Sequence, residues 1–228
     1  TFIGIRQLCK ICSHFDFLLT IYICKNSTYI YTELKNMYSI FMNKEIARKY
    51  GLQKRKALSA KDRKDKSHAI FLQLLPFLTN AEHIGCYIQT GYEVETQNIL
   101  EWCFQHSKHV CAPKVTGNTL QFFEIQSFQD LKEGSYHIKE PVTKETATIL
   151  DIDLMLVPLS AFDPSGNRCG YGKGYYDSIL KDCKKTIGLA YNCQKVDTID
   201  CEKHDIPLQM IITETAMYTC TSIRCLQK

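Results

Sequence analysis

The chain has 228 residues, of which 45% are hydrophobic and 23% are charged, so its composition excludes a disordered chain and a fibrous fold. Its 28 Lys and Arg residues against 24 Asp and Glu residues give a net charge of +4, a weaker basic bias than nucleic-acid-binding proteins usually show. Residues 44–66 are an exception, because ten of them are basic and three are acidic.

Cysteine usage indicates the compartment. The twelve cysteines follow no regular spacing, and several lie in apolar runs, as Cys86 and Cys111 do. A free cysteine in such a run behaves as a small hydrophobic residue, so the pattern indicates a reducing compartment and not a disulfide framework. We therefore expect a cytoplasmic protein. The uncharged apolar run at residues 17–24 is far shorter than the ~20 residues that a membrane span needs.

Residues 1–41 differ from the rest of the chain. They are rich in Cys, Tyr, Phe and Ile, and they show neither a helical nor an alternating period. Their few basic residues are dispersed, which argues only weakly for an organelle import signal, although import through this segment stays an alternative. Met42 opens the first regular segment and would be a natural start. We expect an N-terminal extension over 1–41, with no part in the chemistry, and one catalytic domain over 42–228.

From Met42 onward, capping and turn residues mark the elements. Asn43 predicts the start of a helix that runs to about Lys56, and Ser59 predicts a second helix that Pro76 ends at about Leu75. Strands are predicted at 84–88, 110–112 (ended by Pro113), 120–124, 154–158, 186–190 and 210–213, and further helices at 96–105 and 174–181. Strands that alternate with helices predict an α/β fold: a three-layer, Rossmann-like α/β/α domain with a largely parallel sheet.

The most informative segment is residues 154–180, LMLVPLSAFDPSGNRCGYGKGYYDSIL. An uninterrupted apolar strand, typical of a central parallel strand, leads into a loop that contains four glycines, Arg168 and Lys173. Glycines let a backbone approach a ligand closely and turn its N–H groups inward, and the N-terminus of the following helix would face the same place. The loop therefore predicts a phosphate-binding site, with an ordinary surface turn as the alternative.

The spacing of the glycines narrows the type of site. The loop has neither the G-x-x-x-x-G-K-[ST] spacing of a P-loop nor the G-x-G-x-x-G spacing of a dinucleotide fingerprint. Asp177, in the first turn of the predicted helix, stands where a magnesium ligand beside bound phosphates would stand. Its alternative role is to complement the helix dipole.

The run NRCGYGKGYYD resembles the signature loop of the 5-formyltetrahydrofolate cyclo-ligase (5,10-methenyltetrahydrofolate synthetase) family. The resemblance covers residues 44 to about 214 and includes KEIARKYGLQKRKALS, YEVET, GSYHIKEP, the loop segment and KHDIPLQMIITE, in that order. It implies an enzyme that uses ATP and Mg²⁺ to convert 5-formyltetrahydrofolate, with or without a polyglutamate tail, to 5,10-methenyltetrahydrofolate. We expect a monomer that binds neither nucleic acid nor a membrane.

The resemblance also implies the site residues. The implied ATP-binding residues are Lys44, Arg48, Arg168, Gly170, Gly172, Lys173, Gly174, Tyr175 and Tyr176, with Arg168 and Lys173 catalytic. The implied substrate-binding residues are Ile88, Glu93, Tyr171, Gly172, Lys173, Gly174 and Tyr175, and the implied magnesium carboxylates are Asp177 and Asp205. Lys44 and Arg48 are four residues apart, so a helix places both on one face, where they either reach one triphosphate or form a solvated basic surface.

Some features depart from this interpretation or compete with it. Cys169 replaces a large aliphatic residue of the family, and Gln209 stands near the position of a frequent acid. Cys103, His106, His109 and Cys111 have a spacing that suggests zinc, but their predicted positions on a helix and the next strand argue against tetrahedral coordination. The alternatives are a noncatalytic module of the same fold that binds a nucleotide, folate or RNA, and a phosphoryl-transfer enzyme with another acceptor.

Overall fold

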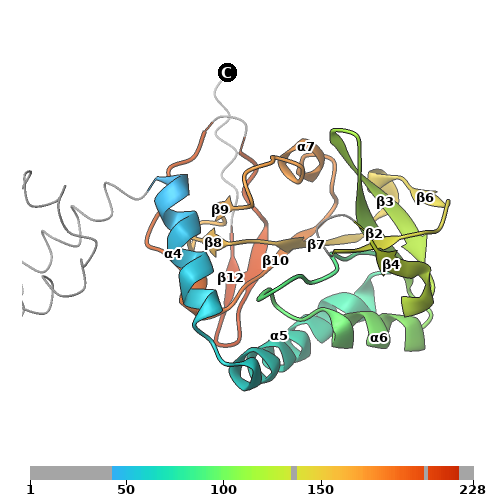
Figure 1. Ribbon diagram of the computed structural model, residues 1–228, viewed down its shortest axis with the longest axis horizontal. Helices are drawn as coiled ribbons and strands as arrows, with labels where there is room; N and C mark the ends of the chain where they lie inside the picture. Colours follow the sequence, from blue (N-terminus) through green and yellow to red (C-terminus); the bar gives the residue numbers. More distant parts are fainter. Residues whose placement is uncertain (1–42, 135–137, 203–204, 221–228) are drawn as a thin grey trace, which may run out of the picture. The chain divides into compact units, whose positions relative to one another are not determined.

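The computed structural model describes residues 43–134, 138–202 and 205–220, and the account below concerns these residues (Figure 1). The residues that we expect to form an extension, 1–41, lie outside them. Within the described ranges, no helix is both long enough and apolar enough to cross a membrane.

An eight-stranded sheet forms the centre of the fold, in the order β12–β11–β10–β7–β1–β2–β3–β6. The strands are β1 His83–Gly85, β2 His109–Thr116, β3 Thr119–Ile125, β6 Thr146–Ala147, β7 Leu154–Pro158, β10 Thr186–Leu189, β11 Met210–Ile212 and β12 Met217–Thr219. The run from β11 to β2 is parallel, whereas β12, β3 and β6 are antiparallel to their neighbours. Smaller two-stranded ladders join β4 Leu131–Glu133 to β5 Lys139–Pro141, and β8 Ala161–Phe162 to β9 Arg168–Cys169.

Helices cover both faces of the sheet. The helices are α4 Lys44–Lys56, α5 Ala60–Asn80, α6 Gln97–Gln105 and α7 Asp177–Leu180, with 3₁₀ turns η1 Phe128–Asp130, η3 Ile149–Asp151 and η4 Asn192–Gln194. α5 and α6 pack on one face around a large apolar cluster, and α7 covers a second cluster on the other face (Figure 1). α4 instead packs against β8, β9 and η4. These layers confirm the predicted α/β/α fold with its largely parallel sheet.

Pro76 lies inside α5, so the prediction that it ends the helix is wrong. A proline inside a helix costs about 3 kcal/mol, in part because it lacks the N–H that would bond to the carbonyl of Leu72. Leu72 is 51% exposed, so water can reach that carbonyl. The extra turn buries Leu78 completely, which contributes roughly 1.5–3 kcal/mol, and the Asn80 side chain bonds to the Pro76 carbonyl at 2.8 Å.

Pro113 lies inside β2. The prediction that it ends the strand is correct for the pairing of β2 with β1 but wrong for its pairing with β3. The parallel pairing with β1 stops at Cys111, whose carbonyl accepts a hydrogen bond from the Cys86 N–H at 2.9 Å. The next bond of a parallel ladder would need an N–H at residue 113, which proline lacks. On the other side, the antiparallel pairing with β3 continues through Pro113 to Thr116.

α7 is shorter than predicted, because it begins at Asp177 and not at Gly174. Gly172 and Gly174 have φ values of +91° and +68°, which a right-handed helix does not contain. A helix of one turn has little macrodipole. The N-terminus of α7 can therefore contribute less to phosphate binding than expected, and phosphate binding at this segment stays a prediction.

Candidate active site

One face of α4 lies against the segment that leads into the glycine-rich loop. The side chain of Asn43 accepts a hydrogen bond from the N–H of Ile46 at 3.0 Å and starts the helix. A Cβ atom at Gly51 would lie 2.0 Å from the carbonyl oxygen of Ser160, so only glycine allows this close approach. Figure 1 shows α4 beside β8 and β9. The residues at 44, 48, 51 and 55 share this face because they are three or four positions apart.

Arg48 holds the beginning of the loop. Its Nε donates to the carbonyl oxygen of Gly170 at 2.7 Å, and a Cβ atom at Gly172 would lie 3.7 Å from its guanidinium. Cβ atoms at Gly170 and Gly174 would meet open space. The structure thus brings the predicted basic residue of α4 together with the predicted loop glycines.

Lys44 contacts the predicted metal ligand Asp205. Its ammonium donates to Asp205 Oδ1 at 2.7 Å and lies 2.5 Å from Oδ2, with Glu202 3.6 Å away. Burial lowers the pKa of Lys44, but the hydrogen bond to Asp205 and the charge of that carboxylate outweigh it and raise the pKa above its usual value. Lys44 is therefore charged, and it lies over one of the two predicted magnesium carboxylates.

Arg168 joins three parts of the site. Its side chain is 5% exposed, and it donates to the carbonyl of Ile206 and to Asp177 Oδ1, both at 2.7 Å. Because Ile206 follows Asp205, this arginine brings the two predicted magnesium carboxylates to the same region. Two of its nitrogen atoms are bonded within the protein, so its contact with phosphate stays a prediction.

The remaining loop residues are arranged around these anchors. Lys173 is exposed on the loop, so its ammonium group is accessible to an anion from solvent. Tyr175 is half-buried. The hydroxyl of Tyr176 is buried and, within the described residues, has no hydrogen-bond partner. Its burial raises the pKa of Tyr176 well above the usual value, so it is a neutral phenol that can donate a hydrogen bond.

The predicted folate-binding residues include a buried carboxylate. Glu93 is 5% exposed, and its Oε2 accepts hydrogen bonds from the N–H of Thr90 at 2.7 Å and from its hydroxyl at 3.2 Å. Its Oε1 accepts a short hydrogen bond from the hydroxyl of Tyr171. Ile88, at the end of the segment after β1, packs against the core. The structure therefore brings Glu93 and Tyr171 together, from positions 78 residues apart.

Arg55 belongs to the same network but was not predicted. It is 5% exposed, and its Nη2 donates to the Tyr171 hydroxyl at 2.8 Å. The sequence does contain one indication of its role: Arg55 lies seven positions after Arg48, two helical turns further along the same face. The local sequence alone does not distinguish it from the basic residues around it.

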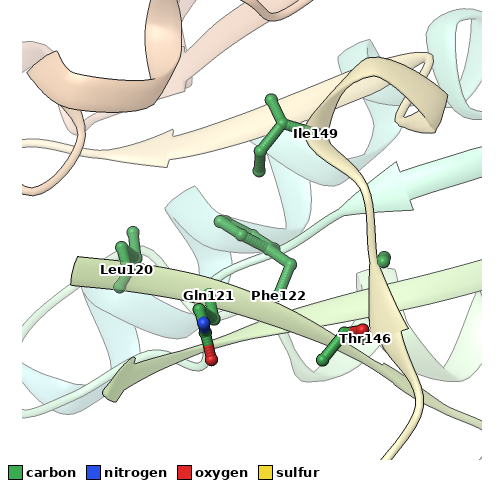
Figure 2. A pocket seen from close by; sticks show the side chains of 6 residues that line it. Leu120, Gln121, Phe122, Thr146 and Ile149 are labelled. Carbon is green, nitrogen blue, oxygen red and sulfur yellow. The ribbon is translucent and has the colours of Figure 1, made fainter. Parts of the chain in front are cut away.

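Other expected features lie away from the loop. Cys103 and Cys111 are buried, and burial raises the pKa of both thiols to about 12. His106 stacks on Trp102, and His109 pairs with Glu124 at 2.7 Å. The four residues whose spacing suggested zinc therefore make separate contacts. Figure 2 shows a pocket between β3 and β6, lined by Leu120, Gln121, Phe122, Thr146, Ala147 and Ile149. This lining carries no charge, so it does not suit a phosphate.

The two departures from the family pattern also have structural positions. Cys169 is buried beneath α4 in a cluster with Ala47 and Ala161, and its Sγ lies 3.4 Å from the Lys44 carbonyl. Gln209 bonds to Thr186 through its backbone and its side chain and so ties β11 to β10. None of these hydrogen bonds involves a glycine of the loop.

A parallel sheet with a glycine-rich loop after its central strand is typical of α/β enzymes that bind ligands beyond the carboxyl ends of their strands. The model of the 5-formyltetrahydrofolate cyclo-ligase family matches residues 41–214. The chain therefore belongs to this family.

Individual relatives agree with this assignment. A 5-formyltetrahydrofolate cyclo-ligase of Haemophilus influenzae is 30% identical over 137 residues, which cover 56% of this chain and 73% of that protein. The NMR structure of Aquifex aeolicus 5,10-methenyltetrahydrofolate synthetase has a TM-score of 0.72 and 32% identity, and covers 81% of this chain and 96% of its own. The Mycoplasma pneumoniae synthetase has a TM-score of 0.63 and 28% identity, over 75% and 98% of the two chains. The chain is a ligase that converts 5-formyltetrahydrofolate to 5,10-methenyltetrahydrofolate.

Proposed function

We propose that this cyclo-ligase uses ATP and Mg²⁺, and that it activates the formyl group by phosphorylation. The formyl oxygen attacks the γ-phosphorus, and the bond from that phosphorus to ADP breaks. The resulting iminium-like phosphate accepts the N10 amine at its carbon, a C–N bond forms, and N10 loses its proton. The C–O bond then breaks and releases phosphate, which leaves the methenyl product. A formamide needs this activation because its oxygen is otherwise a poor leaving group.

The observation that carries the proposal is the glycine-rich loop with cations around it. Phosphoryl transfer requires positioning and neutralisation of charge more than covalent catalysis by the protein. Gly172 and Gly174 have positive φ values, which orient the backbone N–H groups of a loop toward an anion. Arg48 lies beside the loop and Lys173 on it. We assign ATP to Lys44, Arg48, Arg168, Gly170, Gly172, Lys173, Gly174, Tyr175 and Tyr176.

We assign the folate to the other end of the loop. A buried carboxylate such as Glu93 suits the N–H groups of a pterin ring, because a charged acceptor forms stronger hydrogen bonds than a neutral one. Ile88, which packs against the core, would supply an apolar contact for the same ring. Residues 172–175 would then contact both substrates and Tyr171 the folate, with the formyl oxygen directed toward the γ-phosphate.

Asp177 and Asp205 fit the usual protein ligands of magnesium. Mg²⁺ is commonly held by one or two carboxylates together with phosphate oxygens and water, so no larger cluster of acids is needed. Arg168 binds Asp177 through one oxygen and also binds the carbonyl next to Asp205. When bound, the ion would neutralise negative charge on the β- and γ-phosphates. The Lys44 ammonium would compensate the charge of Asp205 when no ion is present.

The purified protein is expected to form 5,10-methenyltetrahydrofolate from 5-formyltetrahydrofolate only when ATP and Mg²⁺ are both present. The reason is that the formyl oxygen does not leave without phosphorylation. The product absorbs in the near ultraviolet and the substrate does not, so absorbance follows the reaction directly. Matched assays without ATP, and with excess chelator, serve as controls. Equal product formation without ATP would contradict the proposed activation.

We also propose that the catalytic domain spans residues 42–228 and that residues 1–41 form an extension. Support comes from the change in composition at Met42 and from the start of the family match at residue 41. Deletion of 1–41 is expected to leave kcat/KM for both substrates within about threefold, because the proposed ligands all lie after Met42. Circular dichroism must first show that the shortened chain folds. A folded but inactive truncation would show that the segment takes part in the chemistry.

A further inference from the structure

Arg55 is a buried cation that the proposed chemistry does not use. Its Nη1 donates to the carbonyl of Leu159 at 3.3 Å and its Nη2 to the hydroxyl of Tyr171 at 2.8 Å. Its Nε is buried and, within the described residues, has no acceptor for its N–H. Burial of a guanidinium is costly unless its charge is compensated. Because this burial is costly, we expect the Arg55 guanidinium to have a specific role, unlike the exposed basic residues of the same helix.

Tyr171 connects this charge to Glu93. The tyrosine hydroxyl accepts a hydrogen bond from Arg55 and donates one to Glu93 Oε1, so the three groups form a chain from cation to carboxylate. Hydrogen bonds in such a chain polarise one another, which strengthens the donation to the carboxylate. Tyr171 is 51% exposed, so packing alone does not fix it. Its position depends on these two hydrogen bonds and on the Arg55 guanidinium, which lies 5.9 Å from the centre of its ring.

Two arginines of α4 hold neighbouring residues of the same loop. Arg48 binds the carbonyl of Gly170, and Arg55 binds the side chain of Tyr171. The two arginines are seven positions apart, about 10.5 Å along a helix. The loop therefore has one anchor near the glycines that we assign to phosphate and a second anchor near the carboxylate that we assign to folate.

We propose that Arg55 is a positioning residue for the folate end of the site. It holds Tyr171 and, through that hydroxyl, fixes the orientation and the charge compensation of Glu93. The inference rests on the proposed function of Glu93 as the acceptor for the pterin. Arg55 acts through Tyr171, so its effect is felt in folate binding and not in ATP binding, for which Arg48 provides the nearer anchor.

Replacement of Arg55 by methionine in the full chain tests this inference. Methionine keeps the apolar bulk and removes the donors, so the KM for 5-formyltetrahydrofolate is expected to rise about tenfold to hundredfold, as for a lost hydrogen bond to a charged group. The KM for ATP is expected to stay within about threefold. Arg55→Lys should recover part of the loss, because an ammonium can still donate to Tyr171. Equal effects on both KM values would overturn the proposal.

A matched control is available one residue earlier on the helix. Lys54 is exposed, and its ammonium lies 5.4 Å from the centre of the Tyr50 ring. Lys54→Met removes the same charge from the same helix but from another face. It is expected to leave both KM values unchanged. A rise in the folate KM equal to that of Arg55→Met would show a general effect of helix charge and would overturn the proposal.

A double-mutant cycle separates positioning from simple structural support. Tyr171→Phe removes only the hydroxyl that joins Arg55 to Glu93, and it is expected to raise the folate KM by itself. In that background Arg55→Met should add less than about twofold, because the connection is already broken. Fully additive effects would overturn the proposal, and so would an unchanged folate KM in Tyr171→Phe, even if Arg55→Met failed to fold.

Glu93→Gln distinguishes failure of this inference from failure of the proposed site. If Glu93→Gln leaves the folate KM unchanged, Glu93 is not the pterin acceptor and both ideas fall. If Glu93→Gln raises the folate KM but Arg55→Met and Tyr171→Phe do not, the proposed site stands and only the role of Arg55 is wrong.

Discussion

Replacement of Arg168 by alanine is expected to reduce both the stability and the activity of the enzyme. The side chain is 5% exposed and is bonded to Asp177 and to the Ile206 carbonyl, so alanine leaves two partly buried acceptors without their donor. Leaving partly buried acceptors without their donor costs about 1–3 kcal/mol. For a chain of this length, that lowers the Tm by about 2–12 °C. Thermal unfolding and the kcat/KM for ATP measure the two effects separately.

The exposed Lys181, at the end of α7, provides the control for Arg168. Lys181→Ala removes a nearby positive charge without breaking a buried contact, so its Tm and activity are expected to match the parent. An Arg168→Ala variant with an unchanged Tm would contradict the anchoring role. An Arg168→Ala variant with an unchanged kcat/KM, assayed well below its Tm, would exclude Arg168 from the proposed ATP site.

Replacement of Lys173 by alanine is expected to reduce activity without any loss of stability. Lys173 is exposed on the loop, so its removal leaves no buried group unpaired. A contact between this ammonium and phosphate oxygens, once water is excluded, is worth roughly 1.5–3 kcal/mol. That corresponds to about one to two decades in the kcat/KM for ATP, at ~1.4 kcal/mol per decade. Steady-state kinetics with varied ATP would measure it.

Lys64 is the matched control for Lys173, because it is an exposed lysine in the basic segment that carries no proposed function. Lys64→Ala is expected to leave ATP kinetics unchanged, since a solvated charge at the surface contributes little. If Lys173→Ala behaves like Lys64→Ala, the loop lysine does not bind phosphate. The proposed phosphate site would then lose its only exposed loop cation among the described residues.

The strongest fold predictions came from local signals. Asn43 caps α4 as predicted, and the apolar run LMLVP forms β7 with the predicted bounds, Leu154–Pro158. The errors concern prolines and glycines, whose effect depends on what lies next to them. Pro76 is tolerated because the core holds the next turn of α5, and Pro113 because β3 is antiparallel to β2. Neither the core beneath α5 nor the direction of the strand beside β2 can be predicted from the residues next to each proline.

The residue types of the site and their local order can be read directly from the amino-acid sequence. The glycines and Lys173 lie within a few residues of one another, so their spacing already predicts a loop that can approach an anion. The same spacing does not reveal which charges are already paired.

Which charged side chains pair with one another depends on the packing of distant elements. Lys44 meets Asp205 across 161 residues, and Arg55 meets Tyr171 across 116 residues. Such contacts exist because α4 packs against β8 and β9, which lead into the loop, with Gly51 allowing the close approach. Since no local pattern encodes which surface a helix will meet, Arg55 could not be distinguished from its exposed neighbours until the fold had buried it.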